Sequence, residues 1–193
     1  MSLLPAFEIG LWNAWIIMVL LLAVATVPLF FDKEKIEKRA EGEPPWEEQT
    51  KISKIVFVIT HLTIMPLTLV YSLFLPLKLD TLWLSIGLPI CLLALIMGLM
   101  FGISFATAPT DKPISKGIFT FSRHPGYFSF FLGCVGIGIA CASWVFLLTA
   151  LVWIISWNYG VVDEERLLLA KYGDDYREYL NRTPRWIGFP KSK

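Results

Sequence analysis

Residues 126–162 read GYFSFFLGCVGIGIACASWVFLLTALVWIISWNYGVV and contain no charged side chain. As a single helix, these 37 residues would reach about 55 Å, which is too long for one crossing of a bilayer core of about 30 Å. We therefore predict two helices, joined by a tight turn at Ala142-Ser143-Trp144, each near the short end of the length that spans a membrane. One long, kinked helix is the alternative.

Three further uncharged stretches have the length of a membrane span, at residues 9–31, 55–77 and 81–110. Backbone polar groups must be paired within a segment that lies in lipid, so each stretch is predicted to be helical. The chain has 193 residues, of which 55% are hydrophobic and 17% charged, and is therefore more apolar than an ordinary globular domain. These features predict an all-α integral membrane protein: a single domain over residues 1–193 with five transmembrane helices, a hairpin between the fourth and fifth, and a short cytoplasmic C-terminal helix.

The basic residues predict the orientation of these helices. With five spans, every Lys and Arg except Lys78 falls on one side, and an excess of basic residues marks the cytoplasmic side. The loops that follow the first and third helices and the C-terminus are then cytoplasmic, and the N-terminus is outside. A single span over residues 126–162 would move the C-terminal basic residues to the other side, which supports the hairpin. The membrane would be the plasma membrane in a prokaryote and the endoplasmic reticulum in a eukaryote.

The remaining elements are predicted from local signals. Residues 1–10 carry no Lys or Arg, and a charged stretch, DKEKIEKR, follows the first apolar run, so we do not expect a signal peptide. We expect a solvated connector over residues 32–54, with a short interfacial helix at Trp46-Glu47-Glu48. The fifth helix should continue past the membrane to Tyr172 and end at Gly173. Asp174 or Asp175 should then cap a last helix.

Small residues recur at every fourth position of the third helix, and a similar set occurs in the fourth. The two sets are Ala94, Gly98, Gly102 and Ala106, and Gly133, Gly136 and Ala140. Such stripes let another backbone approach closely, so they predict packing within the bundle or a homodimer seam; space for a ligand is the alternative. The three cysteines lie in apolar stretches without metal-ligand spacing, and we expect them to pack rather than to pair.

Two polar clusters are expected to meet at the cytoplasmic surface, because the fourth and fifth helices are neighbours. The first cluster, Lys116-Gly117 with Arg123-His124-Pro125, precedes the fourth helix, where Pro suits the first turn and free N–H groups favour an anion. Arg123 can bind a carboxylate or phosphate with two hydrogen bonds. The second cluster is 163–165, which reads DEE. Together the clusters would suit S-adenosylmethionine: its carboxylate at Arg123, its amino group and ribose at Glu164 or Glu165, and its adenine beside His124, Phe119, Phe121 and Tyr127. A nucleotide phosphate would suit the first cluster equally well, and a lipid-headgroup anchor would also explain it.

Two segments resemble a known enzyme family. PISKGIFTFSRHPGY (residues 113–127) and DEERLLLAKYGDDYREYLNRTPR (residues 163–185) resemble the isoprenylcysteine carboxyl methyltransferases and the related phospholipid methyltransferases. The resemblance covers about residues 105–190. It implies S-adenosylmethionine as the cofactor, and Arg123 and Glu165 as the residues at the reacting end. The residues expected to bind the cofactor are Lys116, Gly117, Phe119, His124, Pro125, Tyr127, Glu164 and Glu165.

The predicted function is transfer of a methyl group from S-adenosylmethionine to a membrane-associated or lipophilic acceptor, such as the carboxylate of a prenylated cysteine. The segment FGISFATAPTD (residues 101–111) departs from the family's pattern and leaves the acceptor open. The expected partners are this acceptor and the lipid bilayer; no nucleic acid and no metal are expected. His61 is either a functional side chain or a hydrogen-bond partner of a neighbouring helix. The alternatives are an NADPH-dependent membrane reductase of the sterol-reductase type, since DEE, KYG and PR also occur there, and a non-catalytic membrane scaffold.

Overall fold

A computed structural model describes residues 8–31 and 49–191. Within these residues every regular element is a helix, and the one isolated β-bridge pairs Asn13 with Pro76. The predicted all-α architecture is therefore confirmed for this part of the chain. The short helix predicted at Trp46-Glu47-Glu48 lies outside the described residues. The elements are α1 (Trp15–Ala25), η1 (Val27–Phe30), α3 (Lys51–Phe57), η3 (Val58–Ile64), α4 (Met65–Leu73), α5 (Leu82–Thr107), η4 (Gly117–Thr120), α6 (Pro125–Ala140), α7 (Trp144–Tyr172) and α8 (Asp174–Arg182).

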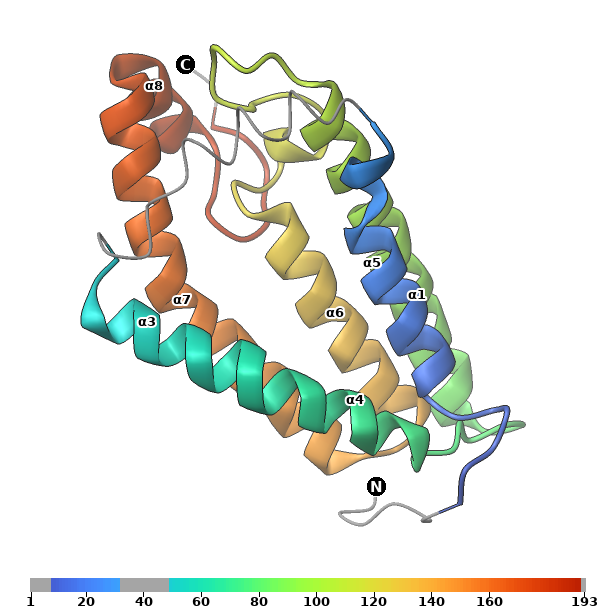
Figure 1. Cartoon of the computed structure of the whole chain (residues 1–193). Helices are drawn as coiled ribbons and strands as arrows, with labels where there is room; N and C mark the ends of the chain where they lie inside the picture. The colour runs from blue at the N-terminus through green and yellow to red at the C-terminus, as the bar shows by residue number, and fades with distance from the viewer. Residues whose placement is uncertain (1–7, 32–48, 192–193) are drawn as a thin grey trace.

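Three helices in the described ranges are long and apolar enough to cross a membrane: the continuous run Lys51–Leu73, α5 and α7. The helices α1 and α6 are apolar but shorter. In Figure 1, α1 and α5 run along one side of the molecule, α6 lies in the middle, and α7 lies on the other side with α8 at its end. The run from α3 to α4 slants across the bundle, from beside α7 toward the end at which α7 begins. The count of five spans stays a prediction.

The first apolar stretch forms a shorter helix than the sequence predicts. α1 has 11 residues, about 16 Å, instead of extending over residues 9–31. The cause is a set of hydrogen bonds from the residues before it to the end of α4. The Asn13 amide donates to the Leu73 carbonyl over 2.7 Å, and the Ala14 N–H donates to the Leu75 carbonyl over 2.8 Å. These bonds replace the helical ones, so the helix begins only at Trp15.

The long uncharged stretch of residues 126–162 forms two helices rather than one. α6 ends at Ala140, and α7 begins at Trp144. Ala142 takes a positive φ of 51° in the turn, and the Ser143 hydroxyl caps α7 by accepting from the Phe146 N–H over 3.3 Å. The break thus coincides with the predicted turn. That both helices cross a bilayer stays a prediction.

The C-terminal helices follow the predicted pattern with one exception. α7 continues to Tyr172, and Gly173, at φ 57°, ends it. Tyr176 and Tyr179 are buried on one face of α8. The expected cap by Asp174 or Asp175 is wrong, because α8 already begins at Asp174 and no side chain caps it. Both carboxylates instead lie in the first turn, where the helix dipole favours negative charge.

Small residues serve close packing inside the chain. A Cβ at Gly136 of α6 would lie 2.6 Å from the Cys91 Sγ of α5, so the two helices touch backbone to backbone there. A Cβ at Gly98 of α5 would lie 2.9 Å from Val24 of α1. These contacts agree with the predicted packing within the bundle, while Ala94 and Gly98 also line the cavity described below, and a homodimer seam stays a prediction. The three cysteines are free and buried, as expected.

Candidate functional site

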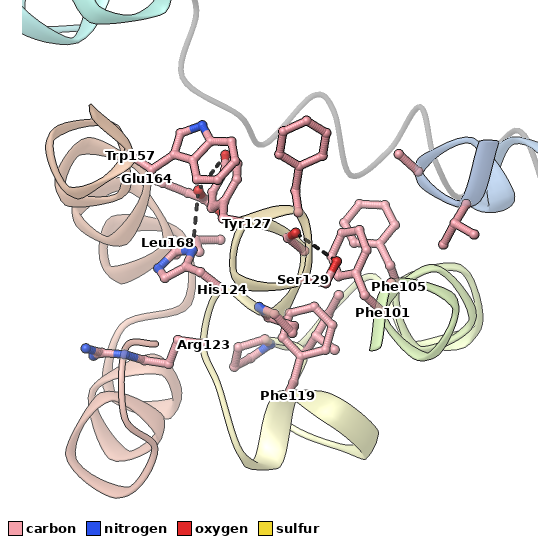
Figure 2. A pocket seen from close by; sticks show the side chains of 18 of the residues that line it. Phe101, Phe105, Phe119, Arg123, His124, Tyr127, Ser129, Trp157, Glu164 and Leu168 are labelled. Atoms are coloured by element: carbon pink, nitrogen blue, oxygen red, sulfur yellow. Dashed lines mark hydrogen bonds and ion pairs between the residues drawn. The ribbon is translucent and has the colours of Figure 1, made fainter. Parts of the chain in front are cut away.

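A cavity of about 420 Å³ lies between α1, η3, α5, α6 and α7 and reaches the α8 end of the bundle. Its volume falls within the range of roughly 300–1,000 Å³ typical of small-molecule sites. The charged side chains that line it are Arg123, Glu164 and Lys171. Figure 2 shows Arg123, His124 and Glu164 on one side of the site and the rings of Phe101 and Phe105 on the α5 side. One part of the cavity is thus charged, and the rest is apolar and aromatic.

The loop before α6 is held in one conformation by its own residues and by α8. Gly117 has a φ of 64°, which favours glycine, and a Cβ there would meet the Ser104 hydroxyl. The Tyr179 hydroxyl donates to the Phe119 carbonyl over 2.8 Å. Pro125 occupies the start of α6, as predicted, where its missing N–H leaves no helical hydrogen bond unmade. The side chains that follow the loop therefore enter the cavity from a fixed backbone.

Residues 184–188 pack along the same loop, and we call this segment the strap. The Arg123 N–H donates to the Pro184 carbonyl over 3.0 Å, and the Gly188 N–H donates to the Phe121 carbonyl over 3.0 Å. The Ser122 hydroxyl donates to the Arg185 carbonyl over 3.3 Å. The strap fastens the last residues of the chain to the Arg-His-Pro motif. The sequence analysis did not foresee this pairing, because backbone hydrogen bonds between irregular segments leave no residue pattern.

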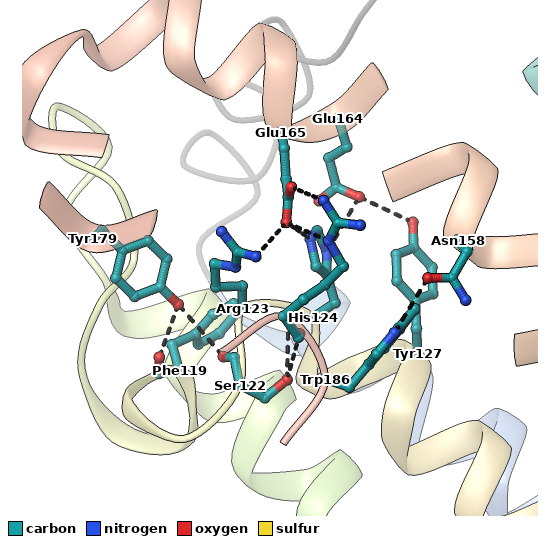
Figure 3. Close-up of polar contacts among 11 residues, drawn as sticks. Phe119, Ser122, Arg123, His124, Tyr127, Asn158, Glu164, Glu165, Tyr179 and Trp186 are labelled. Carbon is teal, nitrogen blue, oxygen red and sulfur yellow. Dashed lines mark hydrogen bonds and ion pairs between the residues drawn. The ribbon is translucent and has the colours of Figure 1, made fainter. Parts of the chain in front are cut away.

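Glu165 is the centre of an ion-pair network. Its carboxylate accepts two hydrogen bonds from Arg185, at 3.1 and 2.6 Å, and one contact of 3.1 Å from His124 Nε2. A guanidinium nitrogen of Arg123 lies 3.3 Å away. Figure 3 shows the guanidinium groups and the imidazole converging on this one carboxylate. Arg185 was missed as a site residue; its only sequence signal is the Pro-Arg pair near the end of the second motif.

Glu164 faces the cavity, unlike its neighbour. Its side chain is 39% exposed; it accepts a hydrogen bond from the Tyr127 hydroxyl over 3.3 Å and lies 3.6 Å from His124 Nδ1. The imidazole of His124 is therefore held between the two carboxylates. The Tyr127 ring stacks on Trp157, with ring centroids 5.1 Å apart. This carboxylate is open to a ligand, while that of Glu165 is occupied by protein cations.

Asp163, the first residue of the acidic triplet, points to a different partner. It is buried and accepts hydrogen bonds from the Ser53 hydroxyl over 2.6 Å, the Thr50 hydroxyl over 2.9 Å and the Thr50 N–H over 3.1 Å. Its carboxylate thereby fastens the N-terminus of α3 to α7. Asp163 is a structural side chain at this position and not part of the cavity lining.

The structure brings most of the predicted site residues to one place. Six of the nine line the cavity: Phe119, Arg123, His124, Pro125, Tyr127 and Glu164. Glu165 is not a lining residue; it contacts Arg123 and His124, which are. Lys116 and Gly117 belong to the loop but are not lining residues. The expected roles of all nine residues in binding and reaction stay predictions.

Two tyrosines of α8 close the site from the strap side. Burial raises the pKa of Tyr176 and of Tyr179 above the usual phenol value, and the nearby carboxylate of Glu165 adds to the rise at Tyr176. Both phenols are therefore neutral donors throughout the physiological range. Tyr179 uses its hydrogen to hold the loop, as described above, and so has a structural role.

Comparisons with known proteins support the family resemblance predicted from the two motifs. Residues 89–175 match the phospholipid methyltransferase family, and this segment runs from α5 through the loop, α6 and α7 into α8. Protein-S-isoprenylcysteine O-methyltransferase of Schizosaccharomyces pombe is 29% identical over 77 residues, which are 38% of this chain and 32% of that protein. The chain thus covers about a third of the length of this relative. These matches bear out the predicted resemblance: residues 89–175 are similar to the phospholipid methyltransferases, and part of the chain is similar to an isoprenylcysteine methyltransferase.

Proposed function

We propose that the protein transfers a methyl group from S-adenosylmethionine to a lipophilic, membrane-associated acceptor. The observation that carries this proposal is the single cavity in which Arg123, His124, Tyr127 and Glu164 lie beside an apolar, aromatic lining. The family match over residues 89–175 supports a methyltransferase over a reductase of the sterol-reductase type or a non-catalytic scaffold. We also propose that the whole chain is one membrane-embedded domain with this site on the cytoplasmic side.

The residues present fit the cofactor. The Nε of Arg123 is buried and has no hydrogen-bond partner among the described residues, so it is available to the carboxylate of S-adenosylmethionine. The open carboxylate of Glu164 would accept from the ammonium group or from the ribose hydroxyls. The rings of Phe119 and Tyr127 would receive the adenine. Glu165 would hold Arg123 and His124 in position for these contacts.

The bound cofactor would supply an electrophilic methyl group on a sulfonium. The sulfonium loses its charge during transfer, so the apolar lining favours the reaction by keeping water away. The side chains of this chain would contribute mainly by holding the donor and the acceptor in line. A carboxylate acceptor needs no base, whereas a hydroxyl, thiol or amine must lose a proton. The relative's name suggests the carboxylate of an isoprenylcysteine as one candidate acceptor.

The test is calorimetric titration of the purified protein, in detergent, with S-adenosylhomocysteine and separately with NADPH. We expect micromolar binding of S-adenosylhomocysteine, a large loss of affinity in Glu165→Ala, and no binding of NADPH. Binding of NADPH alone would favour the reductase. Binding of neither ligand by a folded protein would favour the scaffold.

A further inference from the structure

We infer that the part of the cavity formed by His61, Trp153 and Trp157 binds the methyl acceptor through an uncharged group that both donates and accepts hydrogen bonds, such as a hydroxyl or an amide. This inference rests on the proposed function, since it assigns the second substrate of the same site. The inference goes beyond the proposed function because it names the residues that recognise the acceptor and the kind of group that they bind.

His61 lines the cavity from the middle of η3, a π-helical segment. Pro66 has no N–H to give to the preceding turn, and the Met65 N–H bonds instead to the Thr60 carbonyl, five residues back. This wider turn interrupts the otherwise α-helical run from Lys51 to Leu73 at the residue that faces the cavity. Local π-helical turns of this kind are frequent at functional sites.

The contacts of His61 assign its tautomer. The Thr60 hydroxyl gives its only hydrogen to a backbone carbonyl, that of Val56, over 2.7 Å. His61 Nδ1 lies 3.0 Å from this hydroxyl oxygen and 3.3 Å from the Phe57 carbonyl, which can only accept. Nδ1 therefore carries the hydrogen. Nε2 is left with its lone pair and with no hydrogen-bond partner among the described residues, on a side chain that lines the cavity.

Two donors lie beside this acceptor. Trp153 is fully buried and Trp157 is 7% exposed, and the Nε1–H of each has no partner in the described part of the chain. The Trp153 ring stands at 87° to the His61 ring with centroids 5.5 Å apart, and the two indoles are 4.9 Å apart. Buried indole N–H groups without a partner are uncommon in folded proteins, so two at successive turns of α7 point to a ligand group that satisfies them.

The position of these groups separates them from the cofactor residues. A ladder of rings leads from Tyr127, beside Glu164, through Trp157 and Trp153 to His61, with centroid steps of 5.1, 4.9 and 5.5 Å. The charged lining residues all lie in the loop before α6 or on α7 beyond Val162. Around His61, the lining side chains of α1 and α4 are apolar: Leu21, Val24, Ala25 and Met65. A charged group would find no counter-ion there, whereas a hydroxyl or amide can donate to His61 Nε2 and accept from an indole.

The experiment uses the indole N–H signals of the protein labelled with ¹⁵N-tryptophan, in the presence of saturating S-adenosylhomocysteine. The probes share one chain length: 1-decanol, decanamide, decanoate and decane. The signals of Trp153 and Trp157, assigned by Trp153→Phe and Trp157→Phe, should move on titration with decanol or decanamide. Decanoate should need at least a tenfold higher concentration, and decane should leave both signals in place. His61→Phe should weaken decanol binding at least tenfold.

Two controls keep the outcome decisive. Trp144→Phe changes an exposed tryptophan at the other end of α7 and should leave the decanol titration unchanged. Affinity for S-adenosylhomocysteine is measured for every variant and should stay within a factor of two. This measurement distinguishes loss of decanol binding near His61 from loss of cofactor binding. The inference is overturned if decanol moves neither signal in the wild type, as when ordered water alone fills this end. Equal binding of decanol to wild type and to both His61→Phe and Trp153→Phe would also overturn it.

Discussion

At the scale of single residues, three consecutive carboxylates on α7 serve three different purposes. Neighbouring positions of an α-helix point about 100° apart, so Asp163, Glu164 and Glu165 face different surroundings. Asp163 binds the N-terminus of α3, Glu164 opens into the cavity, and Glu165 is surrounded by protein cations. A single acidic run therefore contains a structural clamp, a carboxylate that lines the cavity and the centre of an ion-pair network.

The network around Glu165 gives the first prediction. In Glu165→Gln the neutral amide no longer neutralises Arg123 and Arg185, which the carboxylate holds at 3.3 and 2.6 Å, and it lacks the charge that strengthens the 3.1 Å contact with His124. Removing one partner of a buried ion pair leaves the other charges uncompensated. We expect the affinity for S-adenosylhomocysteine to fall at least tenfold, equal to about 1.4 kcal/mol, when measured by calorimetry.

The matched control for this variant is Asp174→Asn, which changes an acid of α8 whose side chain is 97% exposed. It should leave the affinity for S-adenosylhomocysteine unchanged. An unaltered affinity in a folded Glu165→Gln protein would show that Glu165 does not position the cofactor residues.

Most of the candidate site could be predicted from the sequence because it lies in two compact motifs. His124, Tyr127 and Glu164 were each expected beside one cavity, and the structure brings them together. Arg185 and the clamp at Asp163 could not be predicted in the same way. Their partners lie 20 and more than 100 residues away, respectively, and depend on how the strap and α3 fold back onto α7.

At the scale of elements, the hydrogen bonds of Asp163 fix the start of α3 against α7. The carboxylate is the shared acceptor for three donors, from Thr50 and Ser53. The three bonds meet at one carboxylate oxygen, whose place the amide oxygen of Asp163→Asn can take, but the negative charge that strengthens these bonds is lost. The amide nitrogen would then replace the oxygen that lies 3.4 Å from Arg166. We expect a loss of about 1–3 kcal/mol in stability, measured as a lower unfolding midpoint in detergent.

Hydrogen exchange locates the effect of this change. Amides of the first turn of α3 should exchange faster in Asp163→Asn, while those in the middle of α5 should keep the wild-type rate. Asp174→Asn is again the matched control and should alter neither rate. Equal exchange rates of the α3 amides in the wild type and in Asp163→Asn would contradict the conclusion that Asp163 fixes the start of α3 to α7.

Contact between α5 and α6 depends on the small residues where the two helices cross. A Cβ at Gly136 would lie 2.6 Å from Cys91 Sγ and 2.8 Å from the Cys91 backbone nitrogen, and backbone cannot be displaced cheaply. Gly136→Ala should therefore destabilise the protein by about 1–3 kcal/mol through overpacking. Gly160→Ala is the matched control. A Cβ at Gly160 of α7 would meet no atom within 4 Å, so this substitution should stabilise the helix by roughly 0.5–1 kcal/mol. Thermal unfolding of both variants tests the pair, and a Gly136→Ala protein as stable as the wild type would contradict the close approach.

The helices have the lengths that the apolar pattern predicts only where no other hydrogen bond and no proline interrupts them. α5 and α7 occupy the stretches in which the sequence predicts them. α1 is shorter because Asn13 and Ala14 bond to the end of α4, and the second apolar run becomes π-helical before Pro66. Hydropathy reports how much apolar surface a stretch offers, but it does not report these individual hydrogen bonds.

At the scale of the whole molecule, the two ends of the bundle differ in charge. At one end, the Leu77 N–H donates to the Trp12 carbonyl and the Lys78 N–H donates to the Ala140 carbonyl. These bonds hold together the residues before α1, the segment after α4 and the last residue of α6. The loop before α6, α8 and the strap lie at the opposite end, as Figure 1 shows, and the start of α3 lies beside α7, where Thr50 bonds to Asp163. Every Lys and Arg of the described residues except Lys78 is in one of these segments, on α7 beyond Val162 or, for Lys191, just after the strap. Between the two ends α5 exposes apolar side chains such as Leu92 and Ile96, which suit contact with lipid.

This separation of charge gives the last prediction. An end rich in Lys and Arg stays on the cytoplasmic side, so Lys191 should be cytoplasmic and Leu79 and Ile9 should be outside. Single substitutions Ile9→Cys, Leu79→Cys and Lys191→Cys place a thiol at exposed positions, and the three native cysteines are buried and give little background. In intact bacterial cells, a membrane-impermeant maleimide should label the first two variants and should label Lys191→Cys only after the cells are opened. Labelling of Ile9→Cys and Lys191→Cys from the same side would contradict an odd number of spans, and labelling of Lys191→Cys from outside would reverse the proposed orientation of the site.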